Sequence, residues 1–174
     1  MIYFIRKIIR AFAAPKHRLA CSSKVWNAGV AELRRRTGGG LHESGAFLLG
    51  TIEGGRRRIE RFAYYDDLDP HSLDSGIVTF DGAGYGPLWQ MCRDEGLTVV
   101  ADIHVHPGVA RQSPSDRANP MIAKKGHIAL IAPDFAAGDC MPGDLGAYEY
   151  QGDHNWSFRT GAEAENYYYV GYWG

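Results

Sequence analysis

VVADIHVHPG, at residues 99–108, is the segment around which the rest of the chain is organised. β-Branched and small apolar residues fill its first half, so we predict a buried strand from Val99 to Val105. Successive side chains of a strand point to opposite faces, so His104 and His106 project from the same face. Pro107 cannot donate a hydrogen bond to a neighbouring strand, so we expect the strand to end directly after the second histidine.

Two imidazoles on one face of a strand can bind the same divalent ion, with zinc–nitrogen bonds of about 2.0–2.1 Å. The SPSD segment at residues 113–116 follows after a short turn, and its Asp116 is the candidate oxygen ligand. Two histidines, one carboxylate and an open fourth position are typical of catalytic zinc rather than structural zinc. An isolated His-x-His pair is more often a packing or surface feature. Here Pro107, the spaced serines, Asp116 and the upstream Glu43 together favour a metal site.

Three segments together resemble the signature of the JAMM (MPN-plus) metalloproteases. They are ESGAFLLG at residues 43–50, HVHP at residues 104–107 and SPSD at residues 113–116. The family signature is a glutamate, then His-x-His-Pro, then Ser-x-x-Asp after a short gap. The order matches, and the resemblance runs from about residue 18 to about residue 151. Asp102 departs from the pattern, because many members carry a small or aromatic residue there.

The resemblance implies a fold and a set of site residues. The fold is a single α/β domain of the MPN/JAB-like, cytidine-deaminase-like kind, with a mixed β-sheet flanked by helices. The expected cofactor is Zn²⁺, held by His104, His106 and Asp116. Zinc lowers the pKa of a bound water from 15.7 to about 7, and Glu43 is expected to accept its proton and deliver it to the leaving amine. Ser113 is expected to donate a hydrogen bond to the developing oxyanion.

Two further residues are candidates for a role at the site. Ser115 is the alternative oxyanion donor, but the family spacing selects Ser113. Asp102 shares a strand face with the two histidines, so it is a candidate to orient one of them from outside the metal's own ligands. The other histidines have no motif around them and are left out of the predicted site; they are His17, His42, His71, His127 and His154.

The activity that the resemblance implies is that of a metal-dependent hydrolase, an isopeptidase or peptidase. Such enzymes cleave amide bonds after the C-terminal tail of ubiquitin or a ubiquitin-like protein, and the absence of long insertions is similar to compact, prokaryotic-type members. The flexible, glycine-rich residues 82–86 are a candidate to hold the substrate tail by strand addition. The alternative is a non-catalytic MPN-type scaffold or protein-binding module. A third alternative is the DNA-repair-associated branch that has a similar His-x-His-Pro motif.

Composition narrows the remaining function classes. A chain of 174 residues is long enough for one domain with a sizeable core. Its formal net charge of −1 gives no support for nucleic-acid binding. Cys21, Cys92 and Cys140 are scattered and odd in number, which argues against a disulfide framework and indicates a reducing, cytoplasmic location. No run of eighteen apolar residues is present, so we expect no transmembrane helix.

We predict three regions: an N-terminal amphipathic segment at residues 1–15, the metalloprotease domain at residues 16–160, and an aromatic tail at residues 161–174. Residues 1–14 have helical apolar spacing interrupted by basic residues. Packing on the domain or on a twin subunit is the simplest role, with an anionic membrane surface or another partner as the alternatives. The tail either packs on the domain or provides a partner site.

The remaining elements follow from apolar spacing and turn residues. The predicted strands span residues 18–21, 43–52, 58–65, 77–80, 127–132, 147–151 and 155–159. The predicted helices span residues 24–36, 87–95, a short segment that begins at Pro114, and residues 121–125. We expect residues 134–146 to form a loop.

Overall fold

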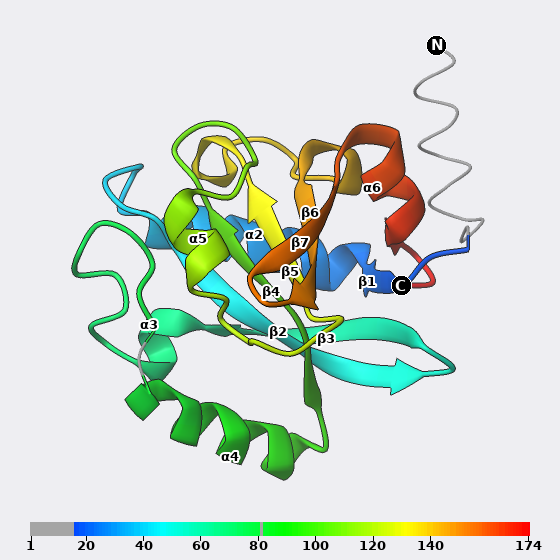
Figure 1. The fold of residues 1–174 in the computed structure, drawn as a ribbon, viewed down its shortest axis with the longest axis horizontal. Coiled ribbons are helices and arrows are strands. Elements are labelled where there is room, and N and C mark those ends of the chain that lie inside the picture. The colour runs from blue at the N-terminus through cyan, green and yellow to red at the C-terminus, as the bar shows by residue number, and fades with distance from the viewer. Residues whose placement is uncertain (1–15, 81) are drawn as a thin grey trace.

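A mixed eight-stranded sheet forms the centre of the computed structural model, which describes residues 16–80 and 82–174 (Figure 1). The strand order is β7-β6-β5-β4-β2-β3-β1-β8. The strands are β1 (Leu19–Ser22), β2 (Gly45–Glu53), β3 (Arg56–Tyr64), β4 (Thr98–Val105), β5 (Ile128–Ala132), β6 (Gly146–Gly152), β7 (Asn155–Arg159) and β8 (Tyr168–Gly171). The α/β fold class is confirmed. The predicted N-terminal amphipathic segment lies outside the described residues.

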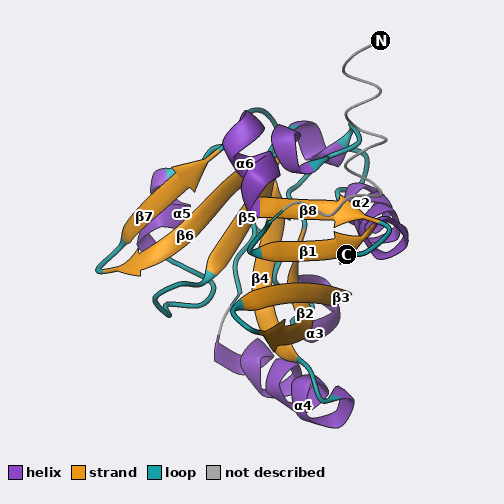
Figure 2. Ribbon diagram, turned by 90° about the vertical axis from the view of Figure 1, so that its right-hand side faces the viewer, coloured by secondary structure: helices purple, strands orange, loops and turns teal. Residues whose placement is uncertain are grey.

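Helices flank the sheet on both sides, as Figure 2 shows. The α-helices are α2 (Ser23–Arg36), α3 (Tyr65–Leu68), α4 (Tyr85–Glu95), α5 (Pro114–Ala118) and α6 (Gly161–Tyr167), and three 3-10 turns are η1 (Gly82–Gly84), η2 (Asp134–Ala136) and η3 (Pro142–Asp144). Within the described ranges, every helix is too short or too polar to traverse a lipid bilayer.

The alternation of side chains along β2 explains why apolar residues pack in one cluster on each face of the sheet. Leu48 points to the face that carries α2 and packs in one cluster with Trp26. Its neighbours Phe47 and Leu49 point to the opposite face and pack with residues of α3 and α4. A run of consecutive apolar residues is therefore buried on both faces of the sheet.

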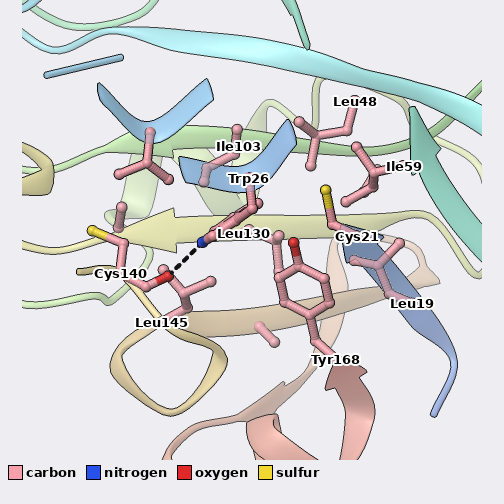
Figure 3. Packing of buried hydrophobic residues seen from close by; sticks show 14 of the residues in the cluster. Leu19, Cys21, Trp26, Leu48, Ile59, Ile103, Leu130, Cys140, Leu145 and Tyr168 are labelled. Atoms are coloured by element: carbon pink, nitrogen blue, oxygen red, sulfur yellow. Dashed lines mark hydrogen bonds between the residues drawn. The ribbon is translucent and has the colours of Figure 1, made fainter. Parts of the chain in front are cut away.

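The larger cluster is centred on Trp26, which is fully buried (Figure 3). Its indole Nε1 donates a hydrogen bond of 3.0 Å to the backbone oxygen of Cys140, so the one polar atom of the ring is satisfied inside the core. Tyr168 contacts the indole edge-on, with ring centroids 5.1 Å apart. This contact joins the C-terminal part of the chain to α2.

Several predicted elements are confirmed with small shifts in their ends. The predicted helix at residues 24–36 is α2, and the Ser22 side chain accepts a hydrogen bond from the backbone nitrogen of Val25 at its start. The helix predicted at residues 87–95 is α4, which begins two residues earlier and ends at Gly96 in the left-handed conformation. The strands predicted at residues 43–52 and 58–65 form the antiparallel hairpin β2–β3, and those predicted at residues 147–151 and 155–159 form the hairpin β6–β7.

Two short elements were predicted wrongly. Residues 77–80 form no strand, because their backbone bonds outside the sheet: Val78 N–H donates to the Glu43 side chain and Thr79 N–H donates to the Ser72 oxygen. Residues 121–125 form no helix, because Tyr85 Oη donates to the Met121 carbonyl, and Lys124 N–H donates to the oxygen only two residues before it.

The glycine-rich segment and the loop at residues 134–146 contain turns that were not predicted, whereas part of the aromatic tail packs on the domain, the first of the two roles expected for it. The predicted flexible stretch begins with the 3-10 turn η1, and a Cβ at Gly84 would lie 2.4 Å from the Phe80 ring. The predicted loop at residues 134–146 contains η2 and η3. Residues 161–171 form α6 and β8, and β8 pairs in parallel with β1 at the end of the sheet. Tyr168, Tyr169 and Val170 are buried there.

Candidate metal centre

His104 lies near the C-terminal end of β4, and His106 directly follows that strand. This strand pairs with β2 on one side, antiparallel, and with β5 on the other, parallel. His104 is 5% exposed and His106 is 9% exposed. Gly45 stands opposite His104 on β2, where a Cβ would lie 2.4 Å from the Tyr65 ring and 2.9 Å from the Ile103 oxygen. The backbone at the start of β2 therefore has no room for a side chain beside this pair.

The start of α5 places the Asp116 carboxylate. Ser113 is the N-cap, and its Oγ accepts from the Asp116 backbone nitrogen at 3.2 Å. In return, the Ser113 backbone nitrogen donates to Asp116 Oδ2 at 2.6 Å, which completes a capping box. Pro114 occupies the first turn, where its missing N–H costs nothing. The short helix predicted after Ser113 is confirmed, and its first turn fixes the direction of the carboxylate.

Three ligand-type atoms converge at this point. The Nε2 atoms of His104 and His106 are 3.0 Å apart. Asp116 Oδ1 lies 3.6 Å from His104 Nε2, and Asp116 Oδ2 lies 3.3 Å from His106 Nε2. A tetrahedral zinc ion with bonds of about 2.0–2.1 Å separates its ligand atoms by roughly 3.3 Å. The donor set and its spacing therefore fit one divalent ion, with a fourth position left to water or substrate.

The charges of this cluster are coupled. Burial alone would lower the pKa of His104, but the hydrogen bond and charge of Asp116 outweigh it and raise that pKa above the ordinary value of 6.5. Burial alone would raise the pKa of Asp116, but its contacts with His104 and His106 hold it well below the usual range. Asp116 is thus an ionised carboxylate at neutral pH, as a metal ligand must be.

Glu43 faces the cluster from the residues just before β2. Its Oε1 lies 3.8 Å from His106 Nε2, and its Oε2 accepts a hydrogen bond of 3.3 Å from the Val78 backbone nitrogen. Its own backbone nitrogen donates to the Gly76 oxygen. The prediction that Glu43 lies within a strand is wrong, because β2 begins at Gly45. A carboxylate held in a loop, beside but outside the three-ligand cluster, is placed to exchange protons there.

Asp102 does not have the contacts that were predicted for it. Its Oδ1 lies 2.5 Å from His127 Nε2, and its Oδ2 accepts from Tyr65 Oη at 3.4 Å. Among the described residues, its hydrogen bonds reach neither predicted ligand histidine, and the buried Nδ1 of His104 has no hydrogen-bond partner there. The expectation that Asp102 orients a ligand through a direct bond is therefore wrong.

The sequence reasoning missed the Asp102–His127 pair. His127 directly precedes β5, which pairs in parallel with β4 so that Ala129 stands opposite Asp102. The pair joins two neighbouring strands, and both side chains are almost fully buried. No motif surrounds His127, and its link to Asp102 depends on which strands are neighbours. Only the parallel pairing of β4 with β5 could have revealed it.

Comparison with known proteins bears on the chemistry of this site. No family model matches the chain. Over 62 residues, 36% of the chain, it is 36% identical to a probable metalloprotease, y4jG, of Sinorhizobium fredii (strain NBRC 101917 / NGR234). The match covers 38% of that relative, so the chain spans less than two fifths of its length. Part of the chain is therefore similar to a probable metalloprotease. A possible His-His-Asp metal site within the fold is consistent with that similarity.

Two solved structures share the fold. Protein DSY2949 from Desulfitobacterium hafniense is 17% identical, with a TM-score of 0.62 over 87% of this chain and 92% of its own. A protein from Salinibacter ruber is 20% identical, with a TM-score of 0.50 over 79% of this chain and 84% of its own. At these identities the likeness shows the fold alone.

Proposed function

We propose that the chain is a zinc-dependent peptidase of the JAMM type. The observation that carries the proposal is the convergence of His104, His106 and Asp116, with the carboxylate of Glu43 beside them. These residues come from three separate segments of the sequence, and their order is that of the JAMM signature. The partial similarity to a probable metalloprotease supports the same class.

The protein side chains divide the work of amide hydrolysis among them. His104, His106 and Asp116 would hold the ion, which when bound supplies a Lewis acid and an activated water. Glu43 accepts a proton at its Oε1, the oxygen that faces His106, while its Oε2 is held by the Val78 N–H. The same carboxyl group then returns the proton to the leaving nitrogen, the two-way role of a catalytic carboxylate.

Ser113 supplies a hydroxyl donor in this scheme. Its Oγ accepts the Asp116 backbone N–H, so the orientation of the side chain is fixed while its own O–H proton is still available. A hydroxyl held in this way can donate to an oxyanion without reorganising during the reaction. Loss of one such donor costs about 2.7–4 kcal/mol of barrier.

The substrate we propose is the C-terminal tail of a ubiquitin-like protein, either as a conjugate or as a precursor. The resemblance to the JAMM signature supports this choice. The N-terminal segment and the C-terminal residues remain candidates for contact with a partner or a twin subunit. A cytoplasmic location fits the three cysteines, which are free and buried.

The experiment combines zinc uptake with cleavage. Purified protein is offered a panel of ubiquitin-like fusions, with and without chelator, beside Glu43→Gln and the matched control Glu53→Gln at the exposed far end of β2. We expect one zinc per chain in all three proteins, and chelator-sensitive cleavage by the wild type and Glu53→Gln only. A zinc-loaded wild type that cleaves no member of the panel would favour the scaffold alternative. Equal cleavage by Glu43→Gln would remove Glu43 from the mechanism.

A further inference from the structure

A small cavity of about 230 Å³ opens directly beside the candidate metal centre. Asp116 forms part of its wall, and so does Val78, whose N–H holds the Glu43 carboxylate. The cavity therefore shares one wall residue with the ligand set and another with the proposed proton carrier. Whatever occupies it lies next to the bond that this site would hydrolyse.

Six of the described residues that line the cavity are apolar, and contacts with the core hold several of them in place. Its apolar residues are Ile77, Val78, Phe80, Tyr85, Pro120 and Met121. Phe80 packs edge-on against Phe47 of β2 and against Tyr85, with ring centroids 5.0 Å apart in each pair. Tyr85 Oη donates to the Met121 carbonyl at 2.5 Å, which ties the opposite wall to α4. The walls are thus set before any substrate arrives.

Within the described part of the lining, the polar residues other than Asp116 carry no charge that could pair with a charged group. Thr79, Ser115 and Asn119 are uncharged. Among the lining residues that the structure describes, Asp116 is the single ionisable carboxylate, and its oxygens already face His104, His106 and the Ser113 N–H. A charged side chain would lose its hydration here without gaining an ion pair, which is costly. The chemistry of the cavity selects an apolar occupant.

The volume decides how large that occupant is. Pockets for whole small-molecule ligands have volumes of about 300–1,000 Å³, whereas an apolar cavity of about 150 Å³ holds one benzene ring. At about 230 Å³ the cavity has room for one leucine, methionine or phenylalanine side chain. Consecutive Cα atoms are about 3.8 Å apart, so the side chain of a residue that flanks the reacting amide can reach the cavity.

We propose that this cavity is a specificity pocket for a large apolar side chain on a residue that flanks the scissile bond. The proposal rests on the peptidase function proposed above and names the peptide class which that site would cleave. Glycine on both sides of the bond would leave the apolar walls in contact with water. Burying a leucine instead of a glycine gains about tenfold or more in kcat/KM, since one methylene in an apolar pocket is worth about 10–200-fold.

The first test profiles cleavage of a peptide library by the zinc-loaded protein. We expect leucine, methionine or phenylalanine to exceed glycine at least tenfold at one flanking position. Met121→Trp, which fills the cavity, should bring the leucine-to-glycine ratio of kcat/KM down by at least tenfold. Met121→Ala should shift the preference toward larger aromatic residues. The matched control is Met91→Ala, at a methionine of α4 outside the cavity lining. It should change neither the leucine-to-glycine ratio nor the preference among large residues.

Each ratio is measured on one protein sample, so a partly unfolded variant does not alter it. Glycine equal to or better than leucine at both positions, or an unchanged ratio in Met121→Trp, would overturn the pocket assignment while leaving the peptidase in place.

The second test does not depend on catalysis. Metal-free protein is titrated with N-acetyl-leucine methylamide and with its glycine analogue, and the methyl resonances of Ile77, Val78 and Met121 are followed by NMR. We expect saturable shifts with the leucine compound and at least tenfold weaker binding of the glycine compound. If no peptide is cleaved, the peptidase proposal fails. The NMR shifts then test by themselves whether the cavity binds a large apolar side chain. Methyl resonances that do not move with the leucine compound would refute it.

Discussion

Replacing His127 with leucine tests the buried pair that joins β4 to β5. The Asp102 carboxyl group is 1% exposed and lies 2.5 Å from His127 Nε2, while its other contact, Tyr65 Oη, is 3.4 Å away. Removing one partner of a buried pair costs about 3–5 kcal/mol, because the other partner stays buried without compensation. His127→Leu should lower the free energy of unfolding by that amount.

The size of the chain converts this cost into a melting temperature. An unfolding entropy of about 2.1 cal/mol/K per residue gives about 0.37 kcal/mol/K for 174 residues. The expected decrease in Tm is therefore about 8–14 °C. Urea unfolding at neutral pH, followed by circular dichroism, measures the free energy, and a thermal scan measures Tm.

A double variant separates a broken pair from a damaged core. Asp102→Val with His127→Leu removes both polar partners and leaves apolar side chains on neighbouring strands. Replacing a buried ion pair by apolar residues is often neutral or stabilising, so the double variant should recover most of the loss. A single-variant cost below about 1 kcal/mol would refute the reasoning, because the pair would then contribute no more than an exposed one.

The same variants test the role of Asp102 at the metal centre. Loss of a group that directly orients a metal ligand typically costs about 10–100-fold in affinity. Because the hydrogen bonds of Asp102 go to His127 and Tyr65, Asp102→Val should change the zinc Kd by less than tenfold. A larger loss, measured by competition with a zinc chelator, would show that Asp102 supports the ligands after all.

Three further predictions concern the ligands and the thiols. At a free zinc concentration 100 times Kd, zinc should add about 2.7 kcal/mol to the free energy of unfolding of the wild type. The control His154→Ala, at an exposed histidine, should gain the same amount, and His106→Ala should gain nothing. Calorimetry with and without zinc measures the three values. Because Asp116 raises the pKa of His104, the proton competes with zinc, so apparent affinity should rise with pH and level off above that raised pKa, which a pH series of zinc titrations checks. Burial raises the pKa of Cys21 to about 12 and that of Cys140 to about 11, so neither should react with a thiol reagent at pH 8 until urea unfolds the chain.

Sequence reasoning succeeded where the structure-forming signal is local. The strand that ends at Val105 follows from a β-branched run closed by proline, and α5 follows from a serine cap with Pro114 behind it. Both signals act within a few residues of the groups that they place. The α/β class followed from alternating elements, together with the resemblance carried by three short motifs.

The errors fall where distant segments meet. Residues 77–80 have the composition of a strand, but within the described residues they pair with no strand, and the Val78 and Thr79 N–H groups bond to Glu43 and Ser72 instead. The strand β8 was missed because its partner β1 is about 150 positions away in the sequence. Asp102 was assigned by its strand face alone, whereas the neighbouring strand supplied its partner.

Asp116 shows why the centre could be located from sequence although its surroundings could not. One carboxylate group takes part in two structures: Oδ2 accepts the Ser113 N–H at 2.6 Å and lies 3.3 Å from His106 Nε2. The capping box is a local device, and it aims the carboxylate before any tertiary contact forms. The histidine pair is equally local, because a strand places alternate residues on one face. Folding then has to bring together two pre-set pieces that are ten residues apart. Glu43 has no such local device, and it depends on Val78, a residue whose own position is set by the rest of the fold.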